Sequence, residues 1–386
     1  MIDLTKEQKN SINTLFEWYK NKNKNHLTLG GYAGTGKTTV ISIFRKILFQ
    51  LNPNIRVSLC SYTGRATRVL EKTLKIAGSY YTKDNISTIH SLIYSPIENA
   101  NKEITAWRKK EDIEYDLIII DESSMVDYQI WADLVSFGIP IIAVGDHGQL
   151  PPIYGNFNLM ESPDIKLNEI HRQNLGNPII KLSELARKGG YIKPGKYGTH
   201  ALKYDLTDYD SKDILNHYLE SFDKNTFILT GFNSTRVELN KLIRNTYLFE
   251  TEEPQVNDKV ICLKNNHEKG IYNGMIGYLK SINSFNDCWY TAEILFENNT
   301  FYSGLIYKPQ FNQKSSLNFT DNRKKLIKGD LIDFGYAMTV HKAQGSEADR
   351  VIIFEERSRH MDDLMWARWL YTGITRAKKE IYIFGR

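Results

Sequence analysis

The chain has 386 residues, of which 41% are hydrophobic and 25% charged, and its formal net charge is +5 at pH 7. This length and composition exclude a single small domain and predict a globular, soluble protein that can bury real cores in two or more domains. The three cysteines are far apart, no histidine lies at zinc-binding spacing, and no apolar run reaches the about 18 residues of a membrane span, so we expect a cytoplasmic protein without disulfides, zinc or a membrane partner.

The first strong signal along the chain is a glycine-rich loop. An amphipathic helix is predicted over residues 3–20, and a short strand from His26 to Leu29 then enters the loop. The loop has the spacing G-x4-G-K-[ST] and continues into a segment that is apolar at helical spacing from Val40 to Leu51. Such a loop points backbone N–H groups at phosphates, while its lysine reaches the terminal phosphates and its threonine hydroxyl ligates Mg²⁺. The sequence therefore predicts a nucleotide site with Mg²⁺ at Gly31, Gly34, Thr35, Gly36, Lys37, Thr38 and Thr39.

Two weaker signals follow the loop. A predicted strand from Ile55 to Cys60 ends in a small, hydroxyl-bearing turn where Thr63 and Arg65 are suited to bind phosphates. An ordinary strand-to-helix turn is the simpler interpretation of this segment. Ser87 to His90 is equally compatible with a helix cap beside a buried histidine.

Residues 93–115 lack apolar periodicity and predict an inserted hairpin or excursion, in which Trp107 either covers core surface or stacks on a base. The second strong signal comes next. A buried-type strand from Asp116 to Ile120 delivers two adjacent acids at its end. Downstream of a phosphate loop, this pattern favours Asp121 as a Mg²⁺ ligand and Glu122 as the base that orients and deprotonates water, rather than a merely polar strand end.

The pattern of a strand followed by a polar loop recurs from Ile139 to Val144, and the loop after it contains Gln149, a candidate sensor of the terminal phosphate. Arg172 lies in a polar segment just before a run rich in Asn, Gly and Pro. The local sequence favours a surface charge at this position. The alternative is an arginine that crosses a cleft to stabilise a developing phosphate charge.

A second α/β pattern begins beyond a Gly/Lys/Pro-rich boundary region at residues 187–200, with a predicted strand from Thr226 to Thr230. Residues 254–310 then change to short β-rich runs separated by Asn- and Gly-containing turns, which predict a small all-β module inserted into the α/β domain. The α/β pattern resumes at residues 335–347 and closes with a strand from Ile381 to Phe384.

Taken together and in order, five segments resemble the motor core of superfamily 1 helicases, in the branch of RecD-like and phage Dda-type proteins. These segments are Gly31 to Thr38, Asp121 to Met125, Gly145 to Pro152, Thr339 to Gly345 and Tyr371 to Ala377. The resemblance covers nearly the whole chain. It implies an α/β fold of two RecA-like P-loop motor domains, residues 1–175 with a pin inserted at about 91–115 and residues 176–386 with an SH3-like β-barrel inserted at about 251–334.

The same resemblance implies roles for individual residues. Gln8, which from local sequence alone reads as a solvated side chain, would contact the adenine. Lys37, Thr38, Asp121 and Glu122 keep the roles given above, Gln149 would contact the γ-phosphate, and further nucleotide contacts are expected at Gln344 and Gly345. Arg172 and Arg376 would reach the nucleotide from across an inter-domain cleft. The residues expected to contact the nucleic acid are Tyr62, Thr63, Arg65, Thr88, His90, Trp107, Asn233, Thr339, His341 and Lys342.

One departure from the family pattern is informative. Ser61-Tyr62 stands where the family usually has Ala-Pro before the threonine, which makes Tyr62 a candidate for stacking on a base. The expected function is an ATP- and Mg²⁺-dependent DNA helicase that moves along single-stranded DNA, 5′-to-3′ by resemblance, and acts as a monomer at junctions of single and double strands. The alternative is an ATP-switched clamp or remodeller that does not separate strands. RNA in place of DNA stays possible, since gripping the backbone does not require reading the 2′-OH.

Overall fold

The computed structural model describes residues 4–21, 24–98, 104–152, 157–170, 176–247, 249, 251–264, 266, 269–297, 300–315 and 329–386, with side chains described throughout except at 96–98 and 104–107. The chain divides into two compact units, Met1–Lys181 and Leu182–Arg386, and the division falls inside helix α6 (Pro178–Gly189). Across the described ranges, no helix is both long and apolar enough to cross a membrane.

The first unit is built on a parallel six-stranded sheet with the strand order β3-β2-β6-β7-β1-β8. Its strands are β1 (His26–Gly31), β2 (Val57–Ser61), β3 (Asn85–Thr88), β6 (Leu117–Asp121), β7 (Ile141–Gly145) and β8 (Ile165–Leu167). Parallel strands all end at the same edge of a sheet. The segments that follow β1, β2, β3, β6 and β7 therefore share one edge, where open α/β sheets bind their ligands.

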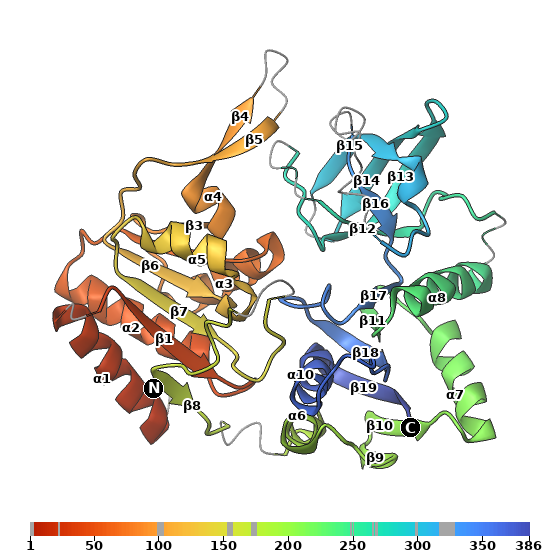
Figure 1. Ribbon diagram of the computed structural model, residues 1–386, viewed down its shortest axis with the longest axis horizontal. Coiled ribbons are helices and arrows are strands. Elements are labelled where there is room, and N and C mark those ends of the chain that lie inside the picture. Colours follow the sequence, from red (N-terminus) through yellow and green to blue (C-terminus); the bar gives the residue numbers. More distant parts are fainter. Residues whose placement is uncertain are drawn as a thin grey trace. The chain divides into compact units, whose positions relative to one another are not determined.

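Helices cover both faces of this sheet. The helices α1 (Lys6–Asn21), α2 (Lys37–Leu51) and α3 (Gly64–Ile76) share a buried apolar cluster with one face, and Figure 1 shows α1 and α2 packed together against it. Helices α4 (Ile89–Ile93) and α5 (Tyr128–Val135) share a second cluster with the other face. Strand β6 serves both, because Leu117 and Ile119 belong to the first cluster while Ile118 and Ile120 belong to the second. Burying each such side chain contributes about 1.5–3 kcal/mol, so this strand holds the two layers together.

Between β3 and β6 the chain leaves the sheet. After α4 it forms an antiparallel hairpin of β4 (Tyr94–Glu98) and β5 (Ile104–Lys109), in which Tyr94 pairs with Lys109 at the root. Figure 1 shows this hairpin extending from α4 away from the sheet. The 3-10 turn η1 (Ser123–Met125) then connects β6 to α5.

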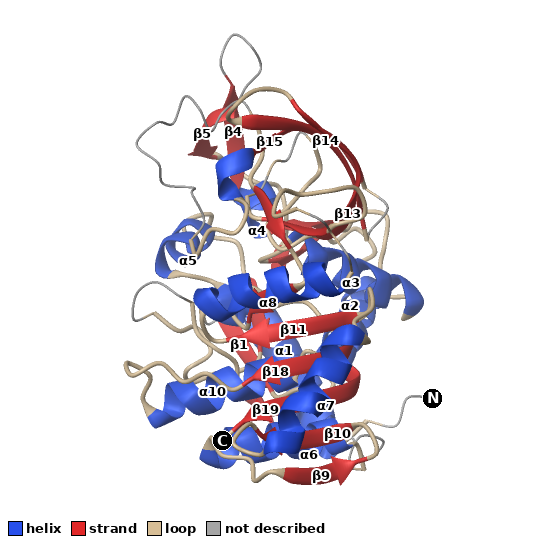
Figure 2. Cartoon of the chain, turned by 90° about the vertical axis from the view of Figure 1, so that its right-hand side faces the viewer, coloured by secondary structure: helices blue, strands red, loops and turns tan. Residues whose placement is uncertain are grey.

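The second unit contains another six-stranded sheet, with the order β17-β11-β18-β19-β10-β9, in which β9 alone is antiparallel to its neighbour. Figure 2 shows β11, β18, β19, β10 and β9 side by side, with α7 and α8 in front of them. The strands are β9 (Gly195–Gly198), β10 (Ala201–Asp205), β11 (Thr226–Thr230), β17 (Ala337–Thr339), β18 (Ala348–Phe354) and β19 (Ala377–Gly385). The covering helices are α7 (Tyr209–Glu220), α8 (Asn233–Thr246) and α10 (Asp363–Ile374).

An antiparallel five-stranded sheet is inserted between α8 and β17, with the order β15-β14-β13-β12-β16. It consists of β12 (Lys259–Cys262), β13 (Ile276–Ser284), β14 (Trp289–Phe296), β15 (Phe301–Tyr307) and β16 (Ile332–Phe334), with the 3-10 turn η3 (Lys308–Gln310) after β15. Its two ends meet, because Asp330, just before β16, accepts from the Tyr307 N–H at 3.1 Å and donates to the Leu305 carbonyl at 2.8 Å. The apolar core of this insert is continuous with the core under α7 and α8.

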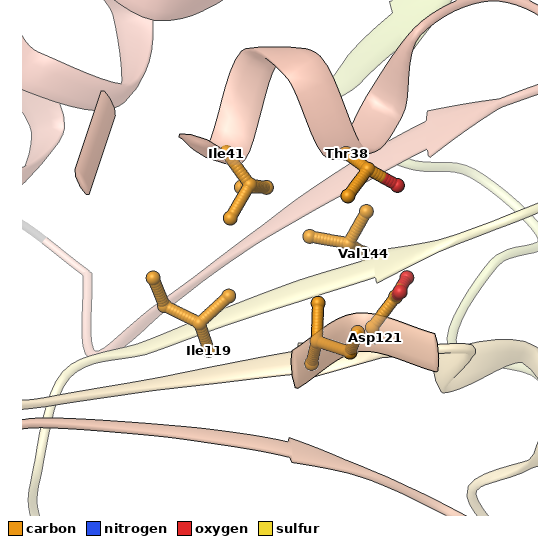
Figure 3. A pocket seen from close by; sticks show the side chains of 6 residues that line it. Thr38, Ile41, Ile119, Asp121 and Val144 are labelled. Atoms are coloured by element: carbon orange, nitrogen blue, oxygen red, sulfur yellow. The ribbon is translucent and has the colours of Figure 1, made fainter. Parts of the chain in front are cut away.

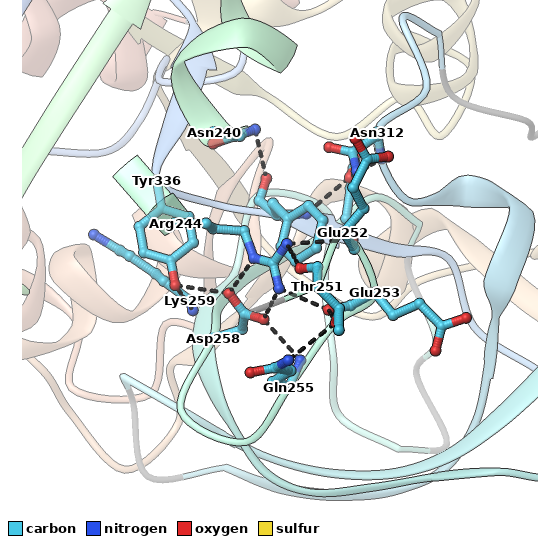
Figure 4. A network of polar contacts seen from close by, with 12 residues as sticks. Asn240, Arg244, Thr251, Glu252, Glu253, Gln255, Asp258, Lys259, Asn312 and Tyr336 are labelled. Atoms are coloured by element: carbon cyan, nitrogen blue, oxygen red, sulfur yellow. Dashed lines mark hydrogen bonds and ion pairs between the residues drawn. The ribbon is translucent and has the colours of Figure 1, made fainter. Parts of the chain in front are cut away.

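A buried network joins the insert to the α/β body (Figure 4). Arg244 of α8 donates to both carboxylate oxygens of Asp258, at 2.8 and 3.0 Å, and to the carbonyls of residues 251–253. The Tyr336 hydroxyl donates to the same carboxylate at 2.8 Å, and Asn240 accepts from the Ala337 N–H at 2.7 Å. Both points where the chain passes between body and insert are therefore tied to α8.

Candidate functional site

The glycine-rich loop after β1 wraps around the ammonium group of Lys37. The Lys37 Nζ donates to the carbonyl oxygens of Gly31 at 2.8 Å and Tyr32 at 3.2 Å. Gly34 and Gly36 have φ angles of 80° and 82°, a left-handed conformation that glycine adopts without steric cost. A Cβ at Gly31 would lie 2.6 Å from the Thr35 hydroxyl oxygen, so this position also requires glycine. Helix α2 begins at Lys37, and its N-terminal N–H groups make the end of the loop suited to a phosphate.

Gln8 braces this loop from α1. Its Nε2 donates to the Thr35 carbonyl at 3.0 Å, its Oε1 accepts from the Thr5 N–H at 3.0 Å, and the residue is 2% exposed. The local interpretation of Gln8 as a solvated side chain is therefore wrong, because the start of α1 packs against a loop that lies more than 20 residues further along the chain. Thr35 is buried and Thr39 is half-buried, both within the same loop-to-helix turn.

Thr38 and Asp121 face a common pocket. Figure 3 shows the Thr38 hydroxyl and the Asp121 carboxylate on the same side of a pocket lined by Ile41, Ile119 and Val144. Burial raises the pKa of Asp121, and the nearby Lys37 ammonium counteracts that rise. Mg²⁺ in nucleotide sites is held by one or two protein oxygens together with substrate phosphates and water. A hydroxyl and a carboxylate beside a phosphate loop fit such an ion, and within the described ranges no group of three or more His, Cys, Asp or Glu side chains offers a metal site.

Glu122 follows Asp121 in an unusual backbone conformation. Its φ angle is 53°, in the left-handed region, and its N–H donates to the Asp121 carboxylate at 3.0 Å. The turn is fixed by Ser123, whose hydroxyl donates to the Val144 carbonyl on β7 at 2.8 Å. A Cβ at Gly145 would lie 2.9 Å from that hydroxyl, so β7 approaches the turn closely.

Gln149 lies in the loop after β7 and is 5% exposed. Its Nε2 donates to the Asp146 carboxylate at 3.3 Å, while its Oε1 is buried without a hydrogen-bond partner. Asp146 also accepts from the Gly148 N–H at 2.9 Å, which closes the loop on itself. An unpaired buried carbonyl oxygen costs about 1–3 kcal/mol, which indicates a position that a ligand or water completes.

The residues expected to contact nucleic acid in the first unit gather where β2 and β3 end. Thr63 caps α3 by accepting from the Ala66 N–H at 3.2 Å, and Thr88 caps α4 by accepting from the Ser91 N–H at 3.2 Å. Their strands are neighbours, with Ser61 opposite Thr88 in the register. The Tyr62 ring meets the His90 ring edge-on at 6.0 Å, and Arg65 lies in the first turn of α3. The structure thus brings five of the six residues predicted in this unit, Tyr62, Thr63, Arg65, Thr88 and His90, to one edge.

A second group gathers at the corresponding edge of the second sheet. Thr339 ends β17 opposite Thr230 of β11, and Asn233 is the first residue of the helix that follows β11. His341 and Lys342 follow β17, and burial lowers the pKa of each. The Lys342 ammonium donates to Asn273 of the inserted sheet at 2.9 Å, so the insert contacts this loop directly.

Arg376 lies near Gln344 and Gly345 in the second unit. It is 4% exposed, and its guanidinium donates to the carbonyls of Thr372 at 3.0 Å and Ser346 at 3.2 Å and to the Thr375 hydroxyl at 3.1 Å. These three acceptors are neutral. Gly345 has a φ angle of 70°, and Gln344 is buried beside it.

Two expected residues cannot be placed, and one residue was missed. Arg172 and the side chain of Trp107 lie outside the described residues. Glu356, which was not identified from the sequence, accepts from the N–H groups of Gly231 and Phe232 at 2.9 Å each and from the Thr235 hydroxyl, beside Asn233. The sequence does contain a signal for it, because Glu355 and Glu356 form an acidic pair at the end of a buried strand, the same pattern that identified Asp121.

Comparisons with known proteins agree with this arrangement. Residues 19–155 match the model of an AAA domain, and residues 334–384 match the model of a UvrD-like helicase C-terminal domain. The first match contains three of the five segments noted above, and the second contains the other two. The ATP-dependent DNA helicase dda of Enterobacteria phage T4 is 25% identical over 450 residues, which cover 98% of this chain and 99% of that protein. The chain is similar over nearly its whole length to helicases of the RecD and Dda branch of superfamily 1.

Two further likenesses extend this comparison, one in sequence and one in fold. The ATP-dependent RecD2 DNA helicase of Deinococcus radiodurans is 25% identical over 397 residues, which cover 93% of this chain but 47% of that relative, so the chain spans about half its length. Pif1 helicase from Bacteroides, solved with ADP-AlF3 and ssDNA, superposes with a TM-score of 0.54 at 17% identity over 99% of this chain and 92% of that chain. The superfamily 1 resemblance read from the five segments is confirmed, and so is the α/β fold with RecA-like parallel sheets.

Proposed function

We propose that this protein is an ATP-dependent DNA helicase that moves 5′-to-3′ along single-stranded DNA and unwinds duplexes ahead of it. The observation that carries the proposal is the shared edge of the first sheet. The nucleotide pocket follows β1, β6 and β7, and the predicted strand contacts follow β2 and β3, which adjoin β6 in the same sheet. The nucleotide and the DNA strand would then contact the same rigid sheet, so a change in the bound nucleotide would alter the contacts to the DNA.

In this proposal the chain carries two motor domains with two insertions. Residues 1–175 form domain 1A, with the β4–β5 hairpin as the pin of domain 1B at about 91–115. Residues 176–386 form domain 2A, with an SH3-like barrel as domain 2B at about 251–334. The antiparallel order of the inserted sheet and the meeting of its ends near Asp330 support the barrel assignment.

The nucleotide is ATP, held by the loop from Gly31 to Thr39, with Lys37 on its terminal phosphates and Gln8 at the adenine side. Bound Mg²⁺ neutralises charge on the β- and γ-phosphates, and Thr38 and Asp121 would hold it. Glu122 positions and deprotonates the attacking water, and Gln149 senses the γ-phosphate. Gln344 and Gly345 complete the nucleotide contacts.

Arg172 and Arg376 stabilise the charge that develops on the transferred phosphate. The buried Arg376 guanidinium donates to three neutral oxygens, and this supports the role, because a buried charge bonded to neutral oxygens gains most from an anionic ligand.

The nucleic acid is single-stranded DNA and its junctions with duplex. The contacts proposed at Thr63, Thr88, Thr339 and Lys342 are to its backbone, so binding should be weakly sequence-dependent and strongly salt-dependent. The similar Pif1 helicases have been solved with ssDNA and at forked dsDNA, which supports this substrate. The protein is proposed to act as a monomer in the cytoplasm.

The test is unwinding of two duplexes that differ only in the end carrying the single-stranded tail. We expect ATP-dependent separation of the 5′-tailed duplex and little of the 3′-tailed one, with ATP turnover stimulated by single-stranded DNA. A clamp or remodeller would show stimulated turnover without separation of either duplex. Turnover indifferent to single strands would overturn the motor itself.

A further inference from the structure

Both strands of the β4–β5 hairpin are tied at its root to α5 and to the two residues that follow this helix. On β4, the Tyr94 hydroxyl donates to the Asp133 carboxylate at 2.5 Å. On β5, the Lys109 ammonium donates to the Ser136 hydroxyl at 2.5 Å and lies 5.2 Å from the centre of the Phe137 ring. Tyr94 and Lys109 are partners in the hairpin register, so the two contacts hold the same residue pair of the hairpin.

The Tyr94–Asp133 tie is held from both sides. Gln129, one turn earlier on α5, donates to the other carboxylate oxygen of Asp133 at 3.3 Å. Burial, together with the hydrogen bond to Asp133, raises the pKa of Tyr94, so its hydroxyl stays protonated as a donor at neutral pH. A hydrogen bond to a carboxylate is roughly twice as strong as one between neutral groups.

Apolar packing supplies the rest of the attachment. Leu92 and Ile93, just before the hairpin, lie in the same buried cluster as Ile130 and Leu134 of α5. Lys110, just after it, donates its N–H to the Ile93 carbonyl at 2.9 Å and its ammonium to the Ser91 carbonyl at 2.9 Å. A two-stranded hairpin is marginally stable alone, so its direction is set by these contacts at the root.

Helix α5 also begins a few residues after the catalytic acids. The chain runs from Glu122 through η1 to Asp127, which caps α5 by accepting from the Ile130 N–H at 2.9 Å. Tyr94 also lies close to the sheet edge that is proposed to bind DNA, because its ring is 5.7 Å from the His90 ring. The His90 ring in turn contacts the Tyr62 ring.

We propose that α5 is the mount of the strand-separating hairpin, that is, the helix that fixes the orientation of the hairpin. We propose further that Asp133, acting through Tyr94, is a positioning residue for strand separation. This inference rests on the proposed function of the hairpin as the pin. Asp133 takes no part in ATP hydrolysis or in gripping the strand. It keeps the β4–β5 hairpin aligned with the sheet edge along which the single-stranded DNA passes. Each ATP turnover then moves the duplex against a hairpin whose orientation is fixed.

The variants that test the mount are Tyr94→Phe, which keeps the ring beside His90 and removes only the hydroxyl, and Asp133→Ala. Tyr128→Phe is the matched control, since it removes a tyrosine hydroxyl from α5, the helix that carries Asp133, at a residue that is 66% exposed. The substrate is a forked duplex with a 5′ tail, and ATP turnover is measured separately with poly(dT).

We expect Tyr94→Phe and Asp133→Ala each to lower the duplex unwound per ATP hydrolysed by about tenfold, the change that loss of a charge-assisted hydrogen bond brings. Turnover with poly(dT) should stay within about twofold of wild type, and the double variant should be no worse than the stronger single one, because both remove the same bond. Unchanged unwinding per ATP, or a parallel fall in unwinding and turnover, would overturn the inference.

Amide hydrogen exchange separates this inference from the proposed function. Loss of the mount should speed exchange of the Lys110 N–H at the hairpin root in Tyr94→Phe and Asp133→Ala, and leave it unchanged in Tyr128→Phe. If exchange of the Lys110 N–H is unaltered in Tyr94→Phe and Asp133→Ala, the inference that α5 holds the hairpin is wrong, even when the wild type unwinds no DNA. A wild type that fails to unwind while the exchange pattern is as expected overturns the helicase proposal and with it the role assigned to the mount.

Discussion

Glu122 is held in a backbone conformation that residues with a side chain rarely adopt. A φ of 53° costs a non-glycine residue about 1–2 kcal/mol relative to the right-handed region. The surroundings enforce it, through the Glu122 N–H to Asp121 and the Ser123 hydroxyl to β7. Strain of this kind persists where neighbouring contacts over-determine the backbone, and it clusters at active sites. The neighbouring contacts therefore hold this turn in its strained conformation, as expected if Asp121 and Glu122 have the separate roles proposed above.

Glu122→Gln should abolish turnover while leaving binding intact. The amide has the size of the carboxyl group and suits the same backbone, but it cannot accept a proton, so we expect ATP hydrolysis to fall by about 10²–10⁴-fold. Unwinding should be lost with it, whereas affinity for ATP and for single-stranded DNA should stay close to wild type. Phosphate release and fluorescent-nucleotide binding measure the two effects.

The control for this variant is Glu114→Gln, because the Glu114 side chain is 82% exposed and belongs to a surface ion pair with Arg56. It should leave both turnover and binding unchanged. Wild-type unwinding by Glu122→Gln would remove Glu122 from the catalytic machinery.

Among the structural elements, the phosphate loop depends on glycine for two separable reasons. Gly36 combines a φ of 82° with a Cβ position only 2.4 Å from the Gln8 Nε2. Gly78, after α3, also has a positive φ, of 62°, but no atom lies within 4 Å of its Cβ position. Comparing Gly36 with Gly78 separates the free-energy cost of the backbone conformation from the cost of the steric clash with Gln8.

Gly78→Ala should cost about 1 kcal/mol of unfolding free energy, from backbone strain alone. Gly36→Ala should cost more and also weaken ATP binding, because the new methyl group displaces Gln8 from the Thr35 carbonyl. Thermal unfolding and nucleotide titration of both variants measure the difference. Equal stability and equal ATP affinity in the two variants would contradict a bracing role for Gln8.

Elements with strong local patterns could be predicted from the sequence, and those fixed by distant pairing could not. The strand from Thr226 to Thr230 was predicted with the bounds that the structure gives β11, and the buried run before Asp121 was off by one residue. In contrast, β9 and β10 fall in and just after the Gly/Lys/Pro-rich segment interpreted as a boundary loop. Glycine and lysine disfavour strands locally, but pairing of β10 with β19, far along the chain, overrides that preference.

The site divides in the same way. Loop residues and strand-end acids carry their chemistry in short motifs, so their positions could be predicted. The Gln8–Thr35, Arg376–Ser346 and Tyr94–Asp133 hydrogen bonds join segments that are distant in sequence. No local pattern encodes such contacts, because they depend on how the layers pack.

At the scale of the whole chain, the inserted sheet must keep its position relative to the α/β body, whose loop after β17 is proposed to contact the nucleic acid. The excursion leaves after α8 and returns at β17, and Arg244 and Asp258 lie at its base with side chains that are 3% and 0% exposed. The Arg244 guanidinium also lies 4.2 Å from the centre of the Phe334 ring of β16. Lys342 bonds the insert at Asn273, so the base network and this loop act on the same element.

Arg244→Met should destabilise the protein by about 3–5 kcal/mol, because it leaves the Asp258 carboxylate buried without its partner. The matched control is Lys241→Met, one turn earlier on α8, whose ion pair with Glu252 is exposed and should be worth about 1 kcal/mol or less. Replacing both partners, in Arg244→Met with Asp258→Leu, should recover much of the loss, since an apolar pair leaves no buried charge. Chemical denaturation measures all three, and an Arg244→Met variant no less stable than Lys241→Met would show that the insert is held by its apolar core and not by this network.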